Sequence, residues 1–313
     1  MNARNSACFV VVYFGEWPAW FDYFLESCAR NPGFHWMFFT TSAERPKAPE
    51  NVSFHEIDKV RLEELVSRKL GLPYQFSYGY KLCDLKPAYG DIFSDYLSDF
   101  EYWGYTDIDL IWGDLGRFLD ESMTGEYDVI TASTRLLVGH CTLLRNSDDL
   151  RTLYRRAPGY PEKLLTEHYE AFDEEDFDAL IRNHSASGHL TLWERSIQTD
   201  DCILWWAGRR RFLLLWNCGR LTDLFGVRPL GYFHFIQSKH KESFRIDEFP
   251  EETKRFYIDD AGIHPLSQPS DAAKFLLSLL ITFVMTLPWY AKSLLKMVFP
   301  KAFRSWARVL VSR

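Results

Sequence analysis

The sequence lacks the cysteine patterns of metal fingers and of disulfide scaffolds. Its six cysteines are scattered through 313 residues, without a CxxC pair, and this spacing excludes a zinc finger. Most of them stand in apolar stretches, which indicates reduced core residues in a reducing compartment. We also expect no secretory signal, because the apolar run in the opening residues MNARNSACFVVVYF is too short and predicts a first β-strand instead.

Acidic residues are missing from the C-terminal tail. Between Ala272 and Arg313 there are seven Lys or Arg residues and no Asp or Glu, so the formal charge of −7 divides into about −14 over residues 1–271 and +7 over the tail. An acidic body excludes a general nucleic-acid binder. A basic and apolar tail favours an anionic membrane surface as partner.

A long uninterrupted apolar run is missing as well. Residues 275–291 are apolar or small, but Pro288 interrupts them and 17 residues are at the lower limit for a membrane span. We therefore expect residues 1–270 to form the main domain and residues 271–313 to form a helical tail that lies on the cytoplasmic face of the membrane. The alternative is a helical hairpin that packs on the main domain or in a dimer interface.

Aromatic side chains are abundant, at 17% of the residues with 11 Trp. Such an excess indicates either a ring-lined groove for sugars or bases, or an aromatic-rich core, which is the commoner case. The hydrophobic content of 47% is enough for a sizeable core in one large domain or two small ones.

Strand and helix patterns alternate along the first half of the chain. Strands are expected at residues 8–14, 34–41 and 52–57, helices at 18–33 and 59–71, and helical turns on either side of Pro87. This alternation predicts an α/β fold with a mainly parallel sheet, in which ligands bind beyond the carboxyl ends of the strands. Further strands are expected at 127–133, 136–146, 212–217 and 231–236, a helix at 174–183, and a loop over 245–270.

The segment WGYTDIDLIWGDL, residues 103–115, places two aspartates one residue apart in an apolar setting. In a β-strand, Asp107 and Asp109 would project from the same face, and two such carboxylates repel each other unless a cation lies between them. Oxygen ligands favour Mg²⁺ or Mn²⁺ over zinc, and these ions usually hold phosphate oxygens as well. The alternative is a solvated strand end, or aspartates that cap the next turn.

Several blocks of the sequence together resemble a known bacterial family. The segments YKLCDLKPAYGDIF and FEYWGYTDIDLIWGDL, the opening VVYFGEWPAWFDYFLESCARNPGFHWMFFTT, and the later VGHCTLLRN and AFDEEDF resemble GT-A-like glycosyltransferases with a DxD motif, many of them of unknown function. The resemblance runs from about residue 8 to 245. It implies a GT-A-type, Rossmann-like mixed sheet flanked by helices. More distantly, the pattern is similar to sugar transferases that build lipopolysaccharide and capsule.

The resemblance implies a metal and diphosphate site. Asp107 would lie near the ribose and bridge to Mn²⁺ or Mg²⁺, Asp109 would ligate the ion, and His234 would be the third ligand. Lys239 and Lys241 would hold the diphosphate, with His240 between them. The ion and the lysines would stabilise the charge of the diphosphate leaving group. The alternative for a lone histidine such as His234 is a half-buried strand residue.

The nucleotide is expected at the end of the first two strands. Tyr13 or Phe14 could stack on the base, Gly15 would let the backbone approach the nucleotide, and Thr40 would lie at the same sheet edge. An ordinary strand-to-helix turn is the alternative. The sequence also departs from the family at Thr41, where an aspartate is expected, and at Tyr232, where a histidine is common.

The donor sugar is expected near a second group of polar residues. The resemblance implies donor contacts from Asp84 and Lys86, a place in the sugar pocket for His140, and catalytic roles for Asp173 and Glu174. A carboxylate there could accept the proton of the acceptor hydroxyl or stabilise an oxocarbenium-like centre. The alternatives are a solvated helix face for the first pair and a solvated helix start for the acidic pair.

These observations predict a metal-dependent glycosyltransferase that moves a sugar from a nucleotide-sugar donor to a surface glycan or a lipid-linked acceptor. We expect it to be cytoplasmic and peripheral on the inner face of the cell membrane, and the distant relatives suggest retention of anomeric configuration. Two other classes stay open. One is a non-catalytic scaffold of glycan assembly. The other is a phosphohydrolase of the haloacid dehalogenase type. That fold places its DxD on the first strand and requires Thr or Val at the position of Ile111, so both features count against it.

Overall fold

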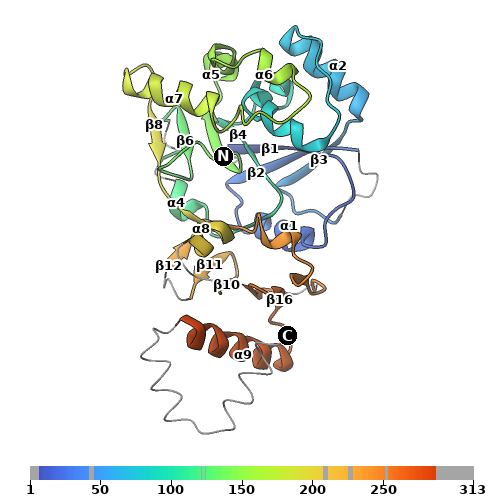
Figure 1. Cartoon of the computed structure of the whole chain (residues 1–313), viewed down its shortest axis with the longest axis vertical. Helices are drawn as coiled ribbons and strands as arrows, with labels where there is room; N and C mark the ends of the chain where they lie inside the picture. Colours follow the sequence, from blue (N-terminus) through green and yellow to red (C-terminus); the bar gives the residue numbers. More distant parts are fainter. Residues whose placement is uncertain are drawn as a thin grey trace.

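The structure is a computed structural model of the chain. It describes residues 7–41, 46–120, 122–123, 125–206, 211–224, 228–250 and 253–286. An α/β part with a large central sheet lies on one side, and a second sheet with the last helix beneath it lies on the other (Figure 1).

The central sheet has seven strands and is mainly parallel, as the alternating pattern predicted. The first four strands in its spatial order are parallel to one another, and β7 is antiparallel to both of its neighbours. The order is β3 (Val52–Glu56), β2 (Phe34–Thr40), β1 (Ala7–Tyr13), β4 (Tyr102–Thr106), β7 (Cys141–Arg145), β6 (Val129–Thr131) and β8 (Leu192–Glu194).

Helices cover both faces of this sheet because residues of β1 alternate between two cores. Val10 packs in one core with Val66 of α2 (Lys59–Leu70), whereas Phe9 packs in the other with Phe24 of α1 (Phe21–Ala29). The other helices of this part are the α-helices α3 (Tyr89–Ile92), α4 (Gly116–Leu119), α5 (Asp148–Thr152), α6 (Glu162–Leu165) and α7 (Asp176–Ala186), and the 3₁₀ helices η1 (Gly79–Ala88), η2 (Ser94–Tyr96) and η3 (Leu153–Arg156).

Local signals fix the ends of α2, where sequence and structure agree closely. The side chain of Asp58 accepts the backbone N–H of Arg61 at the start, and Gly71 ends the helix with a left-handed φ of 70°. The segment around Pro87 is less regular than predicted, because η1 holds Pro87 inside a 3₁₀ helix that continues directly into α3.

The second sheet corrects the prediction of a loop over residues 245–270. That segment contributes three strands, and two of them form a hairpin whose turn is residues 260–261. The strands are too short for a period-two pattern to stand out from the sequence, and the pairing of the longest of them with β10 is not local. The order of the six strands is β12 (Arg228–Leu230), β11 (Arg220–Asp223), β10 (Leu213–Asn217), β15 (Arg255–Asp259), β16 (Gly262–Pro265) and β14 (Arg245–Ile246).

A small third sheet joins the two parts. Its central strand β13 (Tyr232–His234) runs antiparallel to β5 (Leu110–Trp112) and parallel to β9 (Gln198–Asp200), which α8 (Asp201–Trp206) follows. This pairing brings His234 opposite Leu110, the residue after Asp109. Two segments 125 positions apart in sequence thus meet at one site.

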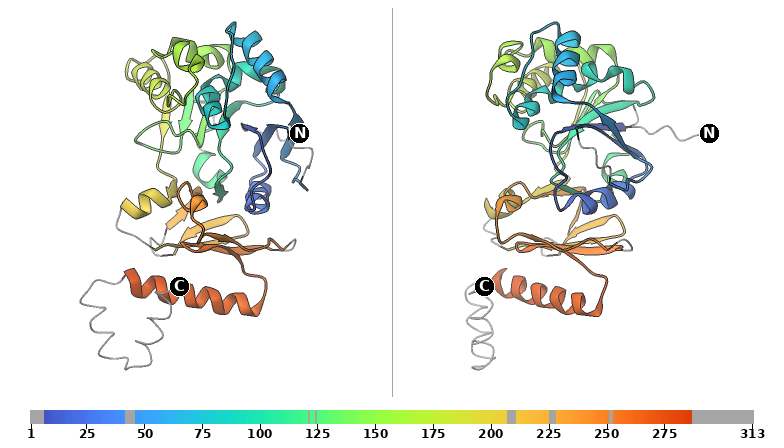
Figure 2. Two further views of the ribbon diagram at one scale, coloured as in Figure 1. Left: turned by 45° about the vertical axis from the view of Figure 1, so that its right-hand side comes forward. Right: turned by 90° about the vertical axis from the view of Figure 1, so that its right-hand side faces the viewer.

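The last described helix, α9 (Pro269–Thr286), packs on the second sheet. Ser278 donates a hydrogen bond of 2.6 Å to Asp259 of β15, and the ring of Phe275 contacts Tyr257 of the same strand. Figure 2 shows α9 across the second sheet from the α/β part. No helix among the described residues is long and apolar enough to cross a membrane. The predicted tail beyond residue 286 lies outside the described residues.

The cysteines are free, as their spacing predicted. Cys8, Cys28 and Cys141 are buried in the core, whereas Cys218 is exposed and so does not fit the prediction of a core residue.

Candidate active site

The DxD segment does not lie in a strand, which corrects the prediction from its pattern. Strand β4 ends at Thr106 and β5 begins at Leu110, so Asp107 and Asp109 occupy the connection. The chain leaves the central sheet here and joins the third sheet, and the ring nitrogen of Trp20 donates a hydrogen bond to the carbonyl of Ile108. The two carboxylates therefore face the same region through a turn of the chain rather than through strand alternation.

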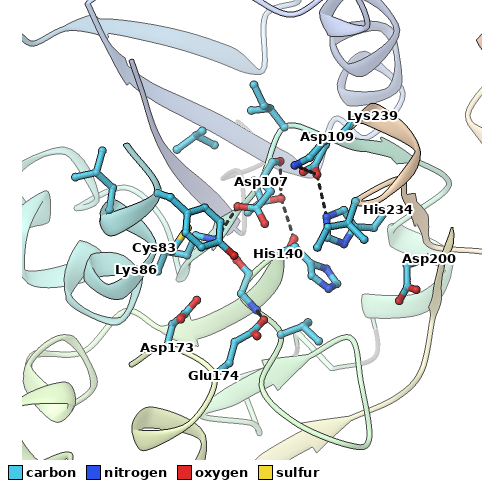
Figure 3. A pocket seen from close by; sticks show the side chains of 18 of the residues that line it. Cys83, Lys86, Asp107, Asp109, His140, Asp173, Glu174, Asp200, His234 and Lys239 are labelled. Carbon is cyan, nitrogen blue, oxygen red and sulfur yellow. Dashed lines mark hydrogen bonds and ion pairs between the residues drawn. The ribbon is translucent and has the colours of Figure 1, made fainter. Parts of the chain in front are cut away.

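A cavity of about 940 Å³ opens beside this connection, at the carboxyl ends of β1 and β4 (Figure 3). Its size is within the usual range for ligand pockets. Ten of the predicted site residues line it: Tyr13, Phe14, Lys86, Asp107, Asp109, His140, Asp173, Glu174, His234 and Lys239. The region that the sequence assigned to a nucleotide sugar is therefore one continuous space.

Four predicted residues lie outside the wall of this cavity. Thr40 and Asp84 are buried, and Lys241 is exposed to solvent. Gly15 has a φ of 131°, a conformation that favours glycine, so the turn itself requires it.

Three side chains in the cavity wall could hold a metal ion. The ligand atoms of Asp107, Asp109 and His234 all lie within 4.8 Å of one another. Asp109 and His234 are each only 4% exposed, and they come from different elements that the third sheet brings together. Two carboxylates and one imidazole fit a divalent ion such as Mn²⁺.

Each carboxylate of the DxD motif has its own cation (Figure 3). Lys86 donates to Asp107 at 2.6 Å and to the carbonyl of Gly139 at 2.8 Å. Lys239 donates to Asp109 at 2.6 Å, and His234 lies 3.2 Å from the same oxygen. The two aspartates thus form separate ion pairs within the protein, and the single metal ion predicted between them stays a prediction.

The buried groups of these ion pairs stay charged, because the charges of their partners outweigh the effect of burial on their pKa values. Burial alone would raise the pKa of Asp109, but His234 and Lys239 outweigh it and hold that pKa well below its usual range. Burial would likewise lower the pKa of Lys86, but the negative charge of Asp107 raises it well above the ordinary value. Burial also opposes a charge on His234, and Asp109 more than compensates, so the pKa of His234 is raised.

His140 lies beside His234, with ring centroids 4.4 Å apart. Burial and the nearby His234 lower the pKa of His140 well below its usual value, which keeps this ring neutral. The hydroxyl of Tyr232 is 2.9 Å from Nδ1 of His140. Tyr232, the departure noted in the sequence, thus holds a pocket histidine in place.

Asp173 and Glu174 form the opposite wall of the cavity (Figure 3). Burial raises the pKa of Asp173 to about 7, and the negative charge of Glu174 adds to this effect while Lys86 opposes it. The side chain of Glu174 accepts the backbone N–H of Gly139 at 3.0 Å. Residues 136–140, which the sequence predicted as strand, precede β7 and contribute to this wall, because β7 begins only at Cys141, opposite the last residue of β4.

A buried ion pair behind the wall was missed by the sequence reasoning. Lys81 and Asp84 are fully buried and 2.9 Å apart. Lys81 also donates to the carbonyls of Lys163 and His168, and Asp84 accepts the backbone N–H groups of Glu170 and Phe172. The i, i+3 spacing that joins the pair suits the three residues per turn of a 3₁₀ helix, and that spacing was the available signal.

Two tyrosines in the wall were also missed. Tyr80 and Tyr169 both line the cavity, with ring centroids 4.6 Å apart, and Tyr80 is 58% exposed. The hydroxyl of Tyr169 donates a long hydrogen bond of 3.4 Å to Asp173. Tyr80 opens the segment YKLCDLKPAYGDIF and Tyr169 stands two residues before AFDEEDF, but no spacing in the sequence connects the two rings.

Residues 9–267 match a family described as a family of unknown function, DUF6625. The chain belongs to this family. The matched segment contains every residue of the cavity wall and ends just before α9. No curated protein matches the chain. Membership confirms the predicted kinship with proteins of unknown function and assigns no activity.

Two solved structures share a distant likeness of fold with the chain. One is the galactosyltransferase LgtC in complex with donor and acceptor sugar analogues, at 12% identity and a TM-score of 0.37, covering 73% of this chain and 87% of LgtC. The other is the glycosyltransferase GlyE of Streptococcus pneumoniae TIGR4, at 13% identity and a TM-score of 0.38, covering 76% of this chain and 56% of GlyE.

Proposed function

We propose that the protein is a metal-dependent glycosyltransferase that moves a sugar from a nucleotide-sugar donor to a surface glycan or a lipid-linked acceptor. One observation carries the proposal: Asp107, Asp109 and His234 converge in a large cavity beside two lysines. Carboxylates, an imidazole and cations in one cavity suit a divalent ion that shares a diphosphate with the protein.

The metal would be held by Asp107, Asp109 and His234, and the imidazole favours Mn²⁺ over Mg²⁺. When bound, the ion would stabilise the negative charge of the diphosphate leaving group. Lys239 would supply a further positive charge to that group. Lys86, fixed between Asp107 and Gly139, would bind the donor sugar on the other side of the metal site.

The remaining wall residues would bind the two ends of the donor. Tyr13 and Phe14 at the end of β1 would contact the base, and Tyr13 already stacks on Trp17 with ring centroids 5.3 Å apart. His140 would face the sugar as a neutral hydrogen-bonding group, because its pKa is lowered by burial.

Asp173 would accept the proton of the acceptor hydroxyl. A general base works best when its pKa is near the working pH, and the pKa of Asp173 is raised by burial to about 7. Glu174 would fix the backbone of Gly139 in the cavity wall through the hydrogen bond that it accepts from its N–H group. Retention of anomeric configuration, suggested by the distant relatives, would require the acceptor hydroxyl that Asp173 deprotonates to attack from the face of the sugar that the diphosphate leaves.

A non-catalytic scaffold is the second candidate, and the burial of Asp173 argues against it. Burying a carboxyl group in a cavity wall is unfavourable, and strongly shifted pKa values concentrate at functional sites. A phosphohydrolase of the haloacid dehalogenase type would carry its DxD at the first strand, whereas Asp107 and Asp109 follow β4. We therefore favour sugar transfer.

We further propose that the protein works at the inner face of the cell membrane. The basic and apolar sequence beyond residue 286 supports this location, and so do Leu276 and Leu280, which are exposed on one side of α9.

The function is tested by donor binding and hydrolysis. Nucleotide sugars would be screened by thermal shift with and without Mn²⁺, because ligands of the native state raise the melting temperature. Donor hydrolysis by the best ligand would then be measured for wild type, Asp109→Asn and Asp114→Asn. Asp114 is the matched control, since it stands in the same segment but accepts the backbone N–H of Arg117 instead of lining the cavity.

Asp109→Asn should lose donor hydrolysis while it stays folded, and Asp114→Asn should stay active. Full turnover by Asp109→Asn, or by wild type in excess EDTA, would contradict the assignment. A screen in which no nucleotide sugar raises the melting temperature would favour the scaffold.

A further inference from the structure

The ammonium group of Lys239 is paired with the carboxylate of Asp109, which the proposed metal ion would need as a ligand. Its ammonium group lies 2.6 Å from Oδ2 of Asp109, the same oxygen that His234 approaches. Asp109 is almost fully buried, whereas a quarter of the Lys239 side chain is exposed. The buried anion therefore has a counter-ion with room to leave.

A metal ion on Asp109 and an ammonium group on the same carboxylate would repel each other at close range in a poorly solvated site. The ion can bind only if Lys239 moves away. A lysine side chain has a flexible four-carbon stem, so its charged end can swing without a change in the backbone. The space open to it is the cavity, where the diphosphate would lie.

Lys86, the other cation of the site, is held differently. It is 7% exposed and donates both to Asp107 and to the carbonyl of Gly139. These two partners and its burial hold its ammonium group in place. Lys86 is therefore a fixed charge, and Lys239 is the cation that can be exchanged.

We propose that Lys239 couples metal binding to donor binding: it pairs with Asp109 until a metal ion takes this carboxylate, and then pairs with the diphosphate. This inference rests on the proposed function. A metal ion alone leaves Lys239 without its anion, so the ion binds weakly. The diphosphate supplies a new anion, so each ligand strengthens the binding of the other by the same factor.

The coupling predicts effects of opposite sign when the charge of Lys239 is removed. Lys239→Met should bind Mn²⁺ alone about tenfold more tightly than wild type, because nothing competes for Asp109. It should bind the Mn²⁺–pyrophosphate complex about tenfold less tightly, because the diphosphate loses a partner. Both factors lie within the usual range of coupling between sites.

Calorimetric titration would measure both constants, with Mn²⁺ alone and with preformed Mn²⁺–pyrophosphate as the probes. Lys239→Gln is a second variant, which guards against an effect of the methionine side chain. Lys254→Met is the control, since it removes the same charge from an exposed side chain outside the cavity wall. Its two constants should equal those of wild type.

Tighter Mn²⁺ binding together with weaker Mn²⁺–pyrophosphate binding in both Lys239 variants supports the exchange. Unchanged Mn²⁺ binding overturns it and leaves Lys239 as a simple phosphate contact. Weaker binding of both probes overturns it in favour of a purely structural role. The proposed function fails separately, if wild type and Asp109→Asn bind Mn²⁺ equally.

Discussion

The carboxylate of Asp84 accepts the backbone N–H of Phe172 at 2.9 Å, one residue before Asp173. A second bond from the N–H of Glu170 holds the other carboxylate oxygen, and Ala171 between them has a left-handed φ of 52°. The chain therefore wraps around a buried anion immediately before the proposed general base. The role of Asp84 that follows from this geometry is to position Asp173.

The first prediction concerns the buried ion pair that supports this turn. Lys81→Met should lower the free energy of unfolding by about 3–5 kcal/mol, because it leaves the fully buried Asp84 without its cation. Arg61→Met, which breaks the exposed pair with Asp58, should cost less than about 1 kcal/mol. Urea denaturation of both variants measures the difference, and equal losses would show that Lys81 is not needed for stability.

The second prediction concerns the dependence of stability on pH. Because burial raises the pKa of Asp173 to about 7, the folded state keeps a proton that the unfolded state releases above about pH 4. The contribution of Asp173 is therefore fully present below pH 4 and is lost as pH rises to about 7. It should amount to a few kcal/mol, on the order of the shift.

Asp173→Asn should remove this part of the slope. The measurement is the free energy of unfolding by urea between pH 4.5 and 8, for wild type and variant. If the difference between the two proteins does not change over that range, the carboxyl of Asp173 is not protonated in the folded protein at mildly acid pH. Turnover of wild type should rise across the same range, because the carboxylate is the base.

The sequence predicted those features that depend on local patterns. Alternating strands and helices predicted the parallel sheet, and Gly71 predicted the end of α2. The DxD motif predicted Asp107 and Asp109 as site residues, and both line the cavity. The resemblance to a family added His234, which no local pattern connects to residues 125 positions earlier. Ten residues of the cavity wall were thus predicted from the sequence, whereas Tyr80 and Tyr169 were not.

What the sequence did not predict depends on pairing between distant segments. The DxD segment looked like one long strand, but β5 pairs with β13 rather than with β1. Residues 245–270 looked like loop because their strands are short and only pairing stabilises them, β15 with the distant β10 and β14 with β16. Asp84 was predicted to contact the donor and its pairing with Lys81 was not foreseen, since only the loop that covers them shows that they are buried.

The third prediction concerns Gly139, where the absence of a Cβ atom leaves room for the carboxylates of Asp173 and Glu174. A Cβ atom there would lie 2.6 Å from Oδ2 of Asp173 and 3.2 Å from Oε1 of Glu174. Gly139→Ala should therefore displace both carboxylates and lower turnover about 100-fold, the usual effect of a misplacement near 1 Å. The loss of stability should be only about 1–3 kcal/mol, because side-chain ends can move aside.

Gly33→Ala is the control, since a Cβ atom at Gly33 would meet no atom within 4 Å. Donor hydrolysis and thermal melting of both variants would be compared with wild type. Wild-type turnover in a folded Gly139→Ala variant would mean that Asp173 and Glu174 do not take part in catalysis.

The last prediction concerns the tail. Six of its seven basic residues follow residue 286, and each is worth about 1 kcal/mol near an anionic membrane surface. The full chain should therefore sediment with anionic vesicles at low salt and remain in solution with neutral ones. A chain that ends at Thr286 should stay in solution with both.

The truncation belongs after Thr286 rather than at the start of the tail, because α9 is part of the fold. Removing α9 would expose Tyr257 and leave Asp259 without Ser278, so a loss of vesicle binding could then reflect unfolding. The truncated chain should keep the melting temperature and donor hydrolysis of the full chain, since the cavity lies wholly upstream. Equal sedimentation of the two chains would place membrane binding on α9, where Leu276 and Leu280 are exposed. Their replacement by Ser in the truncated chain should then release it.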